Sequence, residues 1–326
     1  FMNIKDMLLG IAIGDAFGAG IEFQSRDWIK DNVDFTSYVK TTQPQTYNLG
    51  DYTDDTEMTI GLIKALLSGK TFTTGLLVDY WKKEYDQNME SNGHYRHGYG
   101  IIKQYFKGKK TLEEVKEIQK SLQYPGNAPP MRAVPLGLLK SEIINEYALI
   151  NAETTHPHPK ARAASVLVAR AAEYVIVQEA DQKNVINYCK EHIKGIDEET
   201  NNQLLLIEQL PTIDKLEEEH YEILCGPQPL QKPVPWVSEI NGLASDAMRT
   251  ACTALYIVKY STNTFSGLKT AINVGGDVDS LASICTGILA GKYGLETLPS
   301  FMLEQVEGRQ MLEQLADEFQ KYLLIH

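Results

Sequence analysis

Apolar residues recur at helical spacing along most of this sequence, and the alternating pattern that is typical of strands is almost absent. Helical spacing is found in residues 4–17, 60–67, 74–85, 111–122, 131–139, 161–177, 181–222, 244–260, 280–292 and 310–324. Residues 161–177 are apolar nearly all round, which is typical of a central buried helix. The pattern therefore predicts an all-α fold. We interpret residues 2–326 as a single domain and leave out Phe1.

Four polar or proline-rich segments interrupt the helical pattern, and we predict them to be loops. They are residues 23–50, 86–100, 124–130 and 226–236. A long loop within a compact domain is commonly functional, so the first of these is of particular interest. The last contains Trp236 and several prolines, and we expect it to be an exposed excursion.

Small residues recur every four positions in two of the predicted helices, at Gly10, Gly14 and Gly18 and at Ser283, Gly287 and Gly291. A helix face with almost no side chains allows another backbone to approach closely, so we expect close helix–helix packing there, in the first set at Gly10 and Gly14. The first set is not a dinucleotide-binding motif, because no strand precedes it and no acidic ribose ligand follows. No GK[ST] sequence follows either, which excludes a phosphate-binding loop of that type.

The sequence carries a formal net charge of −12. Binding of nucleic acid depends on Lys and Arg that neutralise phosphates, so this charge argues against a nucleic-acid partner. The four cysteines are far apart and form no CxxC pair, which is typical of reduced thiols. Neither a signal peptide nor an apolar stretch long enough to span a membrane is evident. We therefore expect a cytoplasmic protein with no membrane partner.

Two carboxylates near the C-terminal end follow a glycine turn and precede a predicted helix, in the stretch Gly275-Gly276-Asp277-Val278-Asp279-Ser280. Glycines permit the backbone angles at which two such side chains converge. With the serine hydroxyl, they suit an oxygen-ligand site for magnesium, manganese or calcium. The alternative is a polar turn that caps the following helix.

A second acidic cluster, Thr53-Asp54-Asp55, lies at another predicted helix start. Here too there is an alternative, because aspartates at this position cap free amides and oppose the helix dipole. Both clusters nevertheless combine a hydroxyl with two carboxylates at a junction between loop and helix. Four carboxylates brought together would repel one another, and two divalent cations would neutralise them.

The sequence resembles the ADP-ribosylglycohydrolase family. The motifs that carry the resemblance are GDAFGAGIEF at 14–23, YTDDTEM at 52–58, MRAVPLGLL at 131–139, THPHP at 155–159 and NVGGDVDSLASICTGILAGKYG at 273–294. They occur in the family's order and extend from near the N-terminus to near the C-terminus. The resemblance implies an orthogonal multi-helix bundle with a two-metal site in a central cleft.

The resemblance also implies roles for individual residues. Two magnesium or manganese ions would be held by Thr53, Asp54, Asp55, Asp277, Asp279 and Ser280. Catalysis would involve Glu22, Asp54, Asp277 and Asp279. Contacts to the substrate would come from Gly126, Asn127, His156, Tyr99 and Gly100. We interpret Asp15 as a helix cap or as support for the metal ligands, and His158 as structural. A loop histidine bonded to the backbone is the alternative for His156.

Two departures from the family pattern concern the substrate. The family's usual Gly-Asn-Gly is replaced by residues 126–130, Gly-Asn-Ala-Pro-Pro, in which the prolines lack N–H donors for phosphate. The Asp-Ile-Gly stretch of arginine-directed relatives is replaced by residues 98–100, Gly-Tyr-Gly. If arginine is the acceptor, another acid must contact it, and Asp86 and Glu90 are the nearest in sequence.

The activity that the resemblance implies is metal-dependent hydrolysis that removes ADP-ribose from a modified acceptor. The first choice of acceptor is an arginine side chain of a protein. The alternatives are serine-linked ADP-ribose, a small-molecule conjugate, and a catalytically silent protein that binds ADP-ribose. The transition state would resemble an oxocarbenium ion, and the proton of the attacking water would pass to Glu22 or to another carboxylate of the site.

Overall fold

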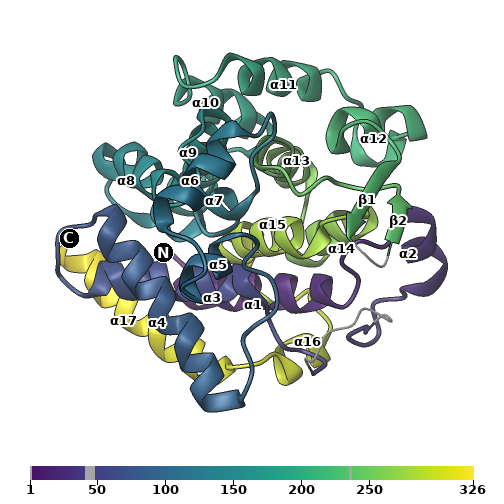
Figure 1. Ribbon diagram of the computed structural model, residues 1–326. Coiled ribbons are helices and arrows are strands. Elements are labelled where there is room, and N and C mark those ends of the chain that lie inside the picture. The colour runs from purple at the N-terminus through teal and green to yellow at the C-terminus, as the bar shows by residue number, and fades with distance from the viewer. Residues whose placement is uncertain (1, 41–47, 235–236) are drawn as a thin grey trace.

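The computed structural model describes residues 2–40, 48–234 and 237–326. Within these ranges the chain forms seventeen α-helices and one two-stranded antiparallel sheet (Figure 1). The helices are α1 (Ile4–Ala19), α2 (Arg26–Asn32), α3 (Asp54–Leu67), α4 (Thr74–Asn92), α5 (Ile102–Phe106), α6 (Leu112–Ser121), α7 (Ala128–Met131), α8 (Ser141–Glu153), α9 (Pro159–Ala172), α10 (Val185–Glu191), α11 (Glu198–Glu208), α12 (Glu218–Cys225), α13 (Ala247–Tyr260), α14 (Thr264–Asn273), α15 (Val278–Tyr293), α16 (Ser300–Gln305) and α17 (Arg309–Ile325). Shorter 3₁₀ turns cover Val134–Leu138, Gln182–Asn184 and Ile213–Lys215, and a π-helical turn covers Glu173–Val177. The predicted all-α class is confirmed, and the helices form an orthogonal bundle.

Helices α1 and α15 lie side by side through the centre of the molecule (Figure 1). A Cβ atom on Gly14 would lie 2.3 Å from the carbonyl oxygen of Ala282, and one on Gly18 would lie 2.4 Å from the Cα of Asp279. Because these distances leave no room for a side chain, the predicted close packing along the glycine stripe is confirmed. The contact also brings the first turn of α15 against the end of α1.

Helix α9 is buried on nearly all sides, as its apolar sequence predicts. It packs against α8 and α13, and it continues from Ala172 into the π-helical turn. With α1 and α15, it forms the interior of the bundle, and the more polar helices α10, α11 and α12 lie outside it (Figure 1).

Helix α4 is longer than the sequence pattern predicts. It extends to Asn92, so residues 86–92, which we expected to be loop, are helical. Their sequence is polar, but Asn88 is buried and continues the inward face of the helix. Gly93 ends the helix with a left-handed φ of 76°. The connection to α5 is therefore shorter than predicted.

Three further segments differ from the sequence predictions. The long loop predicted for residues 23–50 contains α2, although residues 41–47 lie outside the described structure. The helix predicted for residues 131–139 is largely a 3₁₀ turn, in which Pro135 lacks the amide that an α-helix would use. The excursion predicted for residues 226–236 contains a strand, and Trp236 is not among the described residues.

The sheet is a hairpin of β1 (Leu230–Val234) and β2 (Val237–Ile240). Its register pairs Leu230 with Ile240, and an irregularity follows Gln231. A two-stranded sheet has two edges, and prolines are tolerated in edge strands, which explains why this proline-rich sequence still forms one.

Two expectations from composition concern the cysteines and the membrane. All four cysteines are buried and free, as expected for reduced thiols. In the described part of the chain, no helix combines the length and the apolar character needed to cross a membrane.

Candidate metal and active site

The glycine turn before α15 is held in place by backbone hydrogen bonds. Gly275 and Gly276 have φ values of 76° and 77°, a left-handed conformation that favours glycine. The Gly276 carbonyl accepts a hydrogen bond from the Phe23 amide at 2.8 Å, and the Gly276 amide donates to the Gln24 carbonyl at 2.9 Å. The turn therefore fixes Asp277, the N-cap residue of α15, beside the segment that follows α1.

Asp15, in α1, caps the start of α3. Its carboxylate accepts hydrogen bonds from the amide and the hydroxyl of Thr53, at 3.0 and 2.7 Å, and from those of Thr56, at 3.0 and 2.7 Å. The predicted capping role of Asp15 is thus confirmed. Since these bonds satisfy free amides at the helix start, Asp54 and Asp55 are not required as caps. The alternative that Asp54 and Asp55 serve only to cap the helix is therefore disfavoured.

The structure brings the two acidic segments together. Carboxylate oxygens lie within 4.8 Å of one another in two groups, which are Asp15, Asp55 and Asp279, and Glu22, Asp277 and Asp279. Asp279 belongs to both groups. Asp54 lies close enough for its charge to interact with those of Asp15 and Asp277. We call these six residues, Asp15, Glu22, Asp54, Asp55, Asp277 and Asp279, the acid cluster.

Several oxygens of the acid cluster have no hydrogen-bond partner among the described residues. They are Oδ1 of Asp55, Oδ1 of Asp277 and Oδ1 of Asp279, all of them buried. A buried polar atom without a partner is costly, so a ligand for these oxygens is expected. The hydroxyls of Thr53 and Ser280 are also buried here, and that of Ser280 donates to Asp55. This all-oxygen donor set fits hard divalent cations such as magnesium or manganese.

Burial without a compensating cation raises the pKa values of the acid cluster. The pKa of Asp15 and that of Asp54 are both raised to about 6, in each case chiefly by burial. Burial and then the neighbouring carboxylates raise the pKa values of Asp55 and Asp279 well above the ordinary range. The pKa of Glu22 is raised by burial as well. Bound cations would reverse these shifts, because they favour the ionised carboxylates.

His97 is a partner of Glu22 that the sequence interpretation missed. Its Nε2 lies 3.0 Å from Oε2 of Glu22. Burial opposes protonation of the imidazole, but the interaction with Glu22, together with the charges of Asp54 and Asp15, outweighs it and raises the pKa of His97. The one available signal was its position directly before residues 98–100, where the family's acceptor contact is found.

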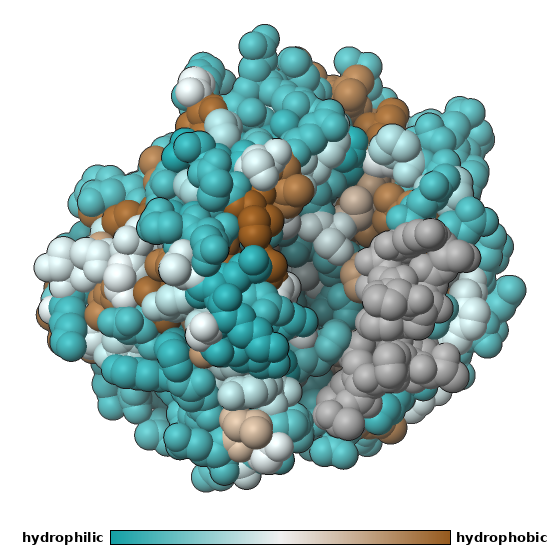
Figure 2. Space-filling model, viewed as in Figure 1, coloured by the Kyte–Doolittle hydropathy of each residue, from teal (hydrophilic) through white to brown (hydrophobic). Residues whose placement is uncertain are grey.

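A cavity of about 170 Å³ opens beside the acid cluster, and Figure 2 shows a hollow near the middle of this face of the molecule. Its lining includes Asp54 and all five of the predicted substrate contacts, namely Tyr99, Gly100, Gly126, Asn127 and His156. Apolar side chains of Ile101, Ile102 and Met131 complete part of the wall. The cavity adjoins the carboxylates directly, because Nδ2 of Asn127 donates to Oδ2 of Asp277 at 2.8 Å.

His156 is buried and neutral. Burial, and then the charge of Arg132, lower its pKa well below the ordinary value. Its Nδ1 lies 2.6 Å from the hydroxyl of Thr155, and Gly126 leaves room for its Nε2 at the cavity wall.

His158 accepts a hydrogen bond from the amide of Lys160 and so caps α9, as its predicted structural role requires.

Arg132 is a second residue that the sequence interpretation missed. It is fully buried at the cavity wall, and its guanidinium stacks 3.8 Å from the Trp81 ring. Its Nε donates to Asn151 at 2.6 Å, and its Nη2 donates to the Asn151 carbonyl and the Thr155 hydroxyl. With these donors occupied, Arg132 stabilises the wall of the cavity.

The loop that departs from the family pattern enters a short helix. Residues 128–131 form α7, and Pro129 and Pro130 occupy its first turn. Amides at that position have no partner within the helix, so prolines are well tolerated there. They also remove two N–H groups that could have faced a phosphate, as the sequence indicated.

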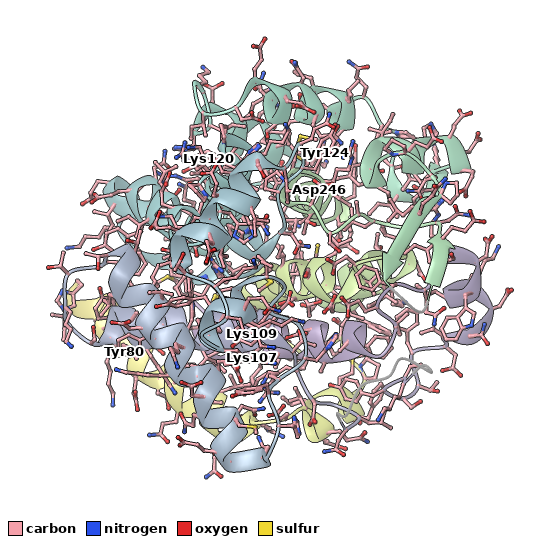
Figure 3. The ribbon with its side chains drawn as sticks, in the orientation of Figure 1. Tyr80, Lys107, Lys109, Lys120, Tyr124 and Asp246 are labelled. Atoms are coloured by element: carbon pink, nitrogen blue, oxygen red, sulfur yellow. The ribbon has the colours of Figure 1, made fainter. Side chains whose placement is uncertain are left out.

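The segment around Gly126, at the cavity wall, contacts the start of α13. Tyr124 and Asp246 lie near each other there (Figure 3). Gly126 pairs with Asp246 in a backbone bridge. The Arg249 guanidinium lies 4.5 Å from the Tyr124 ring, and its Nη1 is 3.3 Å from Oδ2 of Asp246. These contacts tie the loop before α7 to the start of α13.

Asp86 and Glu90 do not lie where the sequence interpretation required. Both belong to α4, because that helix continues to Asn92, and neither lines the cavity. Asp86 forms an ion pair with Lys82, and Glu90 is exposed. The prediction that they lie on the loop beside the predicted substrate contacts is therefore wrong.

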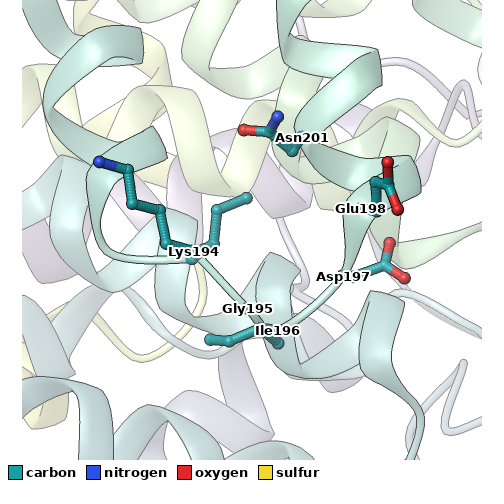
Figure 4. Close-up of a pocket in the computed structure, with 7 residues that line it drawn as sticks. Lys194, Gly195, Ile196, Asp197, Glu198 and Asn201 are labelled. Carbon is teal, nitrogen blue, oxygen red and sulfur yellow. The ribbon is translucent and has the colours of Figure 1, made fainter.

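A larger hollow, of about 500 Å³, lies between α10 and α11 (Figure 4). Its lining includes Lys194, Asp197 and Asn201, but none of the acid cluster. Asp197 caps α11 there by accepting a hydrogen bond from the amide of Thr200. This hollow is an open surface feature apart from the acid cluster.

Comparison with known proteins agrees with this geometry. Residues 2–324 match the family described as ADP-ribosylglycohydrolase. The chain belongs to the ADP-ribosylglycohydrolase family. It is therefore an enzyme that hydrolyses a glycosidic bond of ADP-ribose, and the resemblance stated from the sequence motifs is confirmed.

Similar members of the ADP-ribosylglycohydrolase family come from distant organisms. The chain is 24% identical to ADP-ribosylhydrolase ARH3 of Bos taurus, with 98% of this chain and 94% of that protein covered. It is 25% identical to ADP-ribosyl-[dinitrogen reductase] glycohydrolase of Rhodospirillum rubrum, with coverage of 92% and 88%. A solved structure titled ADP-ribosylglycohydrolase-related protein complex shares the fold, with a TM-score of 0.68, 21% identity and coverage of 98% and 99%.

Proposed function

We propose that this enzyme is a metal-dependent hydrolase that removes ADP-ribose from a modified protein side chain. The observation that carries the proposal is the set of buried carboxylate oxygens without partners, beside a cavity that contains the predicted substrate contacts. Thr53, Asp54, Asp55, Asp277, Asp279 and Ser280 would hold two divalent cations, magnesium or manganese. Such cations supply neutralisation of the carboxylates, contacts to ribose hydroxyls and a lowered pKa for a bound water.

The residues of the chain would hold the substrate and move the proton. Gly126, Asn127 and His156 would contact the ADP-ribose moiety, and the apolar part of the cavity wall would exclude water. Asp54, Asp277 and Asp279 would fix the ribose end next to Glu22. Water would add to the anomeric carbon as the bond to the acceptor breaks, and the acceptor would leave with the bonding electron pair. Glu22 would accept the proton of the attacking water, and the acceptor would gain a proton from Glu22 or from solvent water.

For the acceptor, we propose a hydroxyl group such as that of serine in preference to arginine. A guanidinium is best recognised by a carboxylate fork, and a buried cation without a partner is costly. The described lining of the cavity contains one carboxylate, Asp54, which is already assigned to the cations. An uncharged acceptor such as serine requires no further carboxylate for its recognition, and the same reasoning applies to an uncharged small-molecule conjugate.

The experiment that tests the proposal is incubation with serine-linked and arginine-linked ADP-ribosyl peptides, with and without EDTA. We expect release of ADP-ribose from the serine-linked peptide, loss of release in EDTA, and recovery with excess magnesium or manganese. Cleavage of the arginine-linked peptide alone would reverse the acceptor assignment. Binding of ADP-ribose with no cleavage of either peptide would make the protein a silent member of the family.

A further inference from the structure

The connection between α4 and α5 adopts an unusual backbone conformation. Gly98, Tyr99 and Gly100 have φ values of 100°, 69° and 52°, so three successive residues are left-handed. Glycine tolerates this conformation, but for Tyr99 it is strained. Backbone strain persists only where surrounding contacts hold it, and such strain is concentrated at functional sites.

On its inner side, the loop contacts two carboxylates of the acid cluster. The Asp54 amide donates to the His97 carbonyl at 3.1 Å, and the Tyr99 amide donates in turn to the Asp54 carboxylate. A Cβ atom on Gly98 would lie 1.9 Å from Oδ1 of Asp54, so the backbone is pressed against that side chain. The His97 imidazole contacts Glu22. Displacement of this loop would therefore release both Asp54 and Glu22.

On its outer side, the loop is held by Arg96. The guanidinium forms a fork with Glu307, whose two oxygens lie 2.7 Å from Nη1 and from Nη2. Its Nε donates to Glu57 at 2.6 Å, its Nη1 also donates to the Tyr52 carbonyl at 2.8 Å, and its Nη2 also donates to Asn88 at 3.1 Å. Every nitrogen of Arg96 is thus bonded, to partners from α3, the segment before α3, α4 and the α16–α17 connection.

Tyr99 contacts the same carboxylate as Arg96, that of Glu57. Its hydroxyl donates to Glu57, the carboxylate that also binds Arg96. Its ring is buried and packs edge-on against Tyr85 and Phe106. Arg96 and Tyr99, which flank His97 and Gly98, therefore both bind the carboxylate of Glu57 in α3. Glu57 lies two positions after Asp55.

We propose that Arg96 is a positioning residue of the active site. Through Glu57 and Glu307 it holds residues 97–100, of which Gly98, Tyr99 and Gly100 are left-handed. This segment in turn fixes Asp54 and Glu22. Arg96 does not line the cavity and is not part of the acid cluster, so it would act through the loop. The kinetic part of this inference rests on the proposed function, because it treats Asp54 and Glu22 as catalytic, whereas the structural part does not.

The test compares Arg96 with a matched buried arginine. Arg170 of α9 has a similarly low side-chain exposure, 5% against 9% for Arg96, pairs with Glu173 at 2.7 Å, and does not line the cavity. Arg96→Gln and Arg170→Gln would each be studied by hydrogen–deuterium exchange and by steady-state kinetics with the cleaved substrate. In Arg96→Gln we expect faster exchange of the amides of residues 97–99 and of Asp54, with no such change in Arg170→Gln.

The kinetic result expected for Arg96→Gln is a fall in kcat of about 100-fold, the scale of a small misplacement of catalytic groups, with little change in KM. Arg96→Lys should recover part of kcat, because it keeps the charge but cannot form the fork. If Arg96→Gln does not fold, Glu307→Gln removes the same fork from a partly exposed position and should show the same exchange pattern.

Unchanged exchange at residues 97–99 in Arg96→Gln, with a loss of stability like that of Arg170→Gln, would overturn the proposal. Equal kcat values in the two glutamine variants would also overturn it. If the wild-type enzyme cleaved no ADP-ribosyl substrate, the proposed function would fail, but the exchange experiment would still decide whether Arg96 positions the loop.

Discussion

Helix α3 supplies carboxylates to two buried clusters that differ in how their charge is compensated. Asp55, in the first turn, faces other carboxylates, and its Oδ1 has no partner among the described residues. Glu57, two positions later, bonds to Arg96 and to the Tyr99 hydroxyl. Both residues are almost fully buried, so exposure does not explain the difference.

The cluster of Glu57 and Arg96 is structural, whereas the acid cluster around Asp55 requires a ligand. Burial raises the pKa of Glu57 to about 7, but Arg96 supplies a fixed positive charge beside it. Within the described structure no such cation accompanies Asp55, Asp277 and Asp279. A protein seldom buries several carboxylates without compensation, so the missing charge is expected to come from bound cations. Each prediction below tests whether the two clusters behave as differently as this requires.

The largest effect is expected from Asp55→Asn. We expect kcat to fall by at least about 1,000-fold, the scale seen when a group that stabilises transition-state charge is lost. The free energy of unfolding in EDTA should stay unchanged or increase, because the substitution removes one of several mutually repelling carboxylates. Kinetics with saturating manganese and urea unfolding in EDTA measure the two quantities. A large loss of stability without metal would mean that Asp55 is structural.

Glu57→Gln should show the opposite pattern in stability. Breaking a buried ion pair leaves Arg96 with less compensation, and we expect a loss of about 3 kcal/mol in the free energy of unfolding. Glu84→Gln is a suitable control, because Glu84 pairs with the partly exposed Lys64, and such a pair contributes less than about 1 kcal/mol. Equal losses in the two variants would erase the distinction between the clusters.

The acid cluster should also give the metal-free protein an unusual pH dependence. The folded pKa of Asp54 is about 6, above its ordinary value, so the folded state holds this proton more tightly than the unfolded state. The resulting stability is present below the unfolded pKa of about 4 and is lost as the pH rises through 6. In EDTA, the melting temperature of Asp54→Asn should therefore fall less than that of the wild type between pH 4 and 6. Identical slopes would show that Asp54 does not titrate in this range.

The smallest effect is expected from the double substitution Asp86→Asn and Glu90→Gln. These side chains lie on α4 outside the cavity, and the ion pair of Asp86 with Lys82 is partly exposed. We expect kcat/KM for either ADP-ribosyl peptide to stay within about twofold and stability to change by less than about 1 kcal/mol. A selective loss with the arginine-linked peptide would restore these acids as acceptor contacts.

The part of the structure that the sequence predicts is the part that depends on short-range pattern. Helical spacing identifies the all-α class, and the glycine stripe of α1 correctly indicates its close contact with α15. The end of α4 was missed because its last turn is polar, although Asn88 is buried against the 94–100 loop. The hairpin was missed because prolines disguise an edge strand.

The residues of the site also fall into those that a short sequence motif indicates and those that depend on the packing of distant segments. The acidic residues are recognisable because they stand in short motifs at helix starts, and the structure brings them together. The contacts of Arg96 with Glu307 and of His97 with Glu22 join distant parts of the chain. No local pattern encodes such pairs, since they depend on how the helices pack. The position of Asp15 in the middle of α1 similarly gave no indication of which helix it would cap.

The most direct test of cation binding by the acid cluster is calorimetric titration of the metal-free protein with manganese. We expect two ions per chain in the wild type and in Glu84→Gln, because Glu84 pairs with Lys64 and belongs neither to the acid cluster nor to the loop contacts. We expect Asp279→Asn to lose binding at both positions, because Asp279 belongs to both carboxylate groups. Absence of saturable binding in the wild type, or unchanged binding in Asp279→Asn, would contradict the assignment.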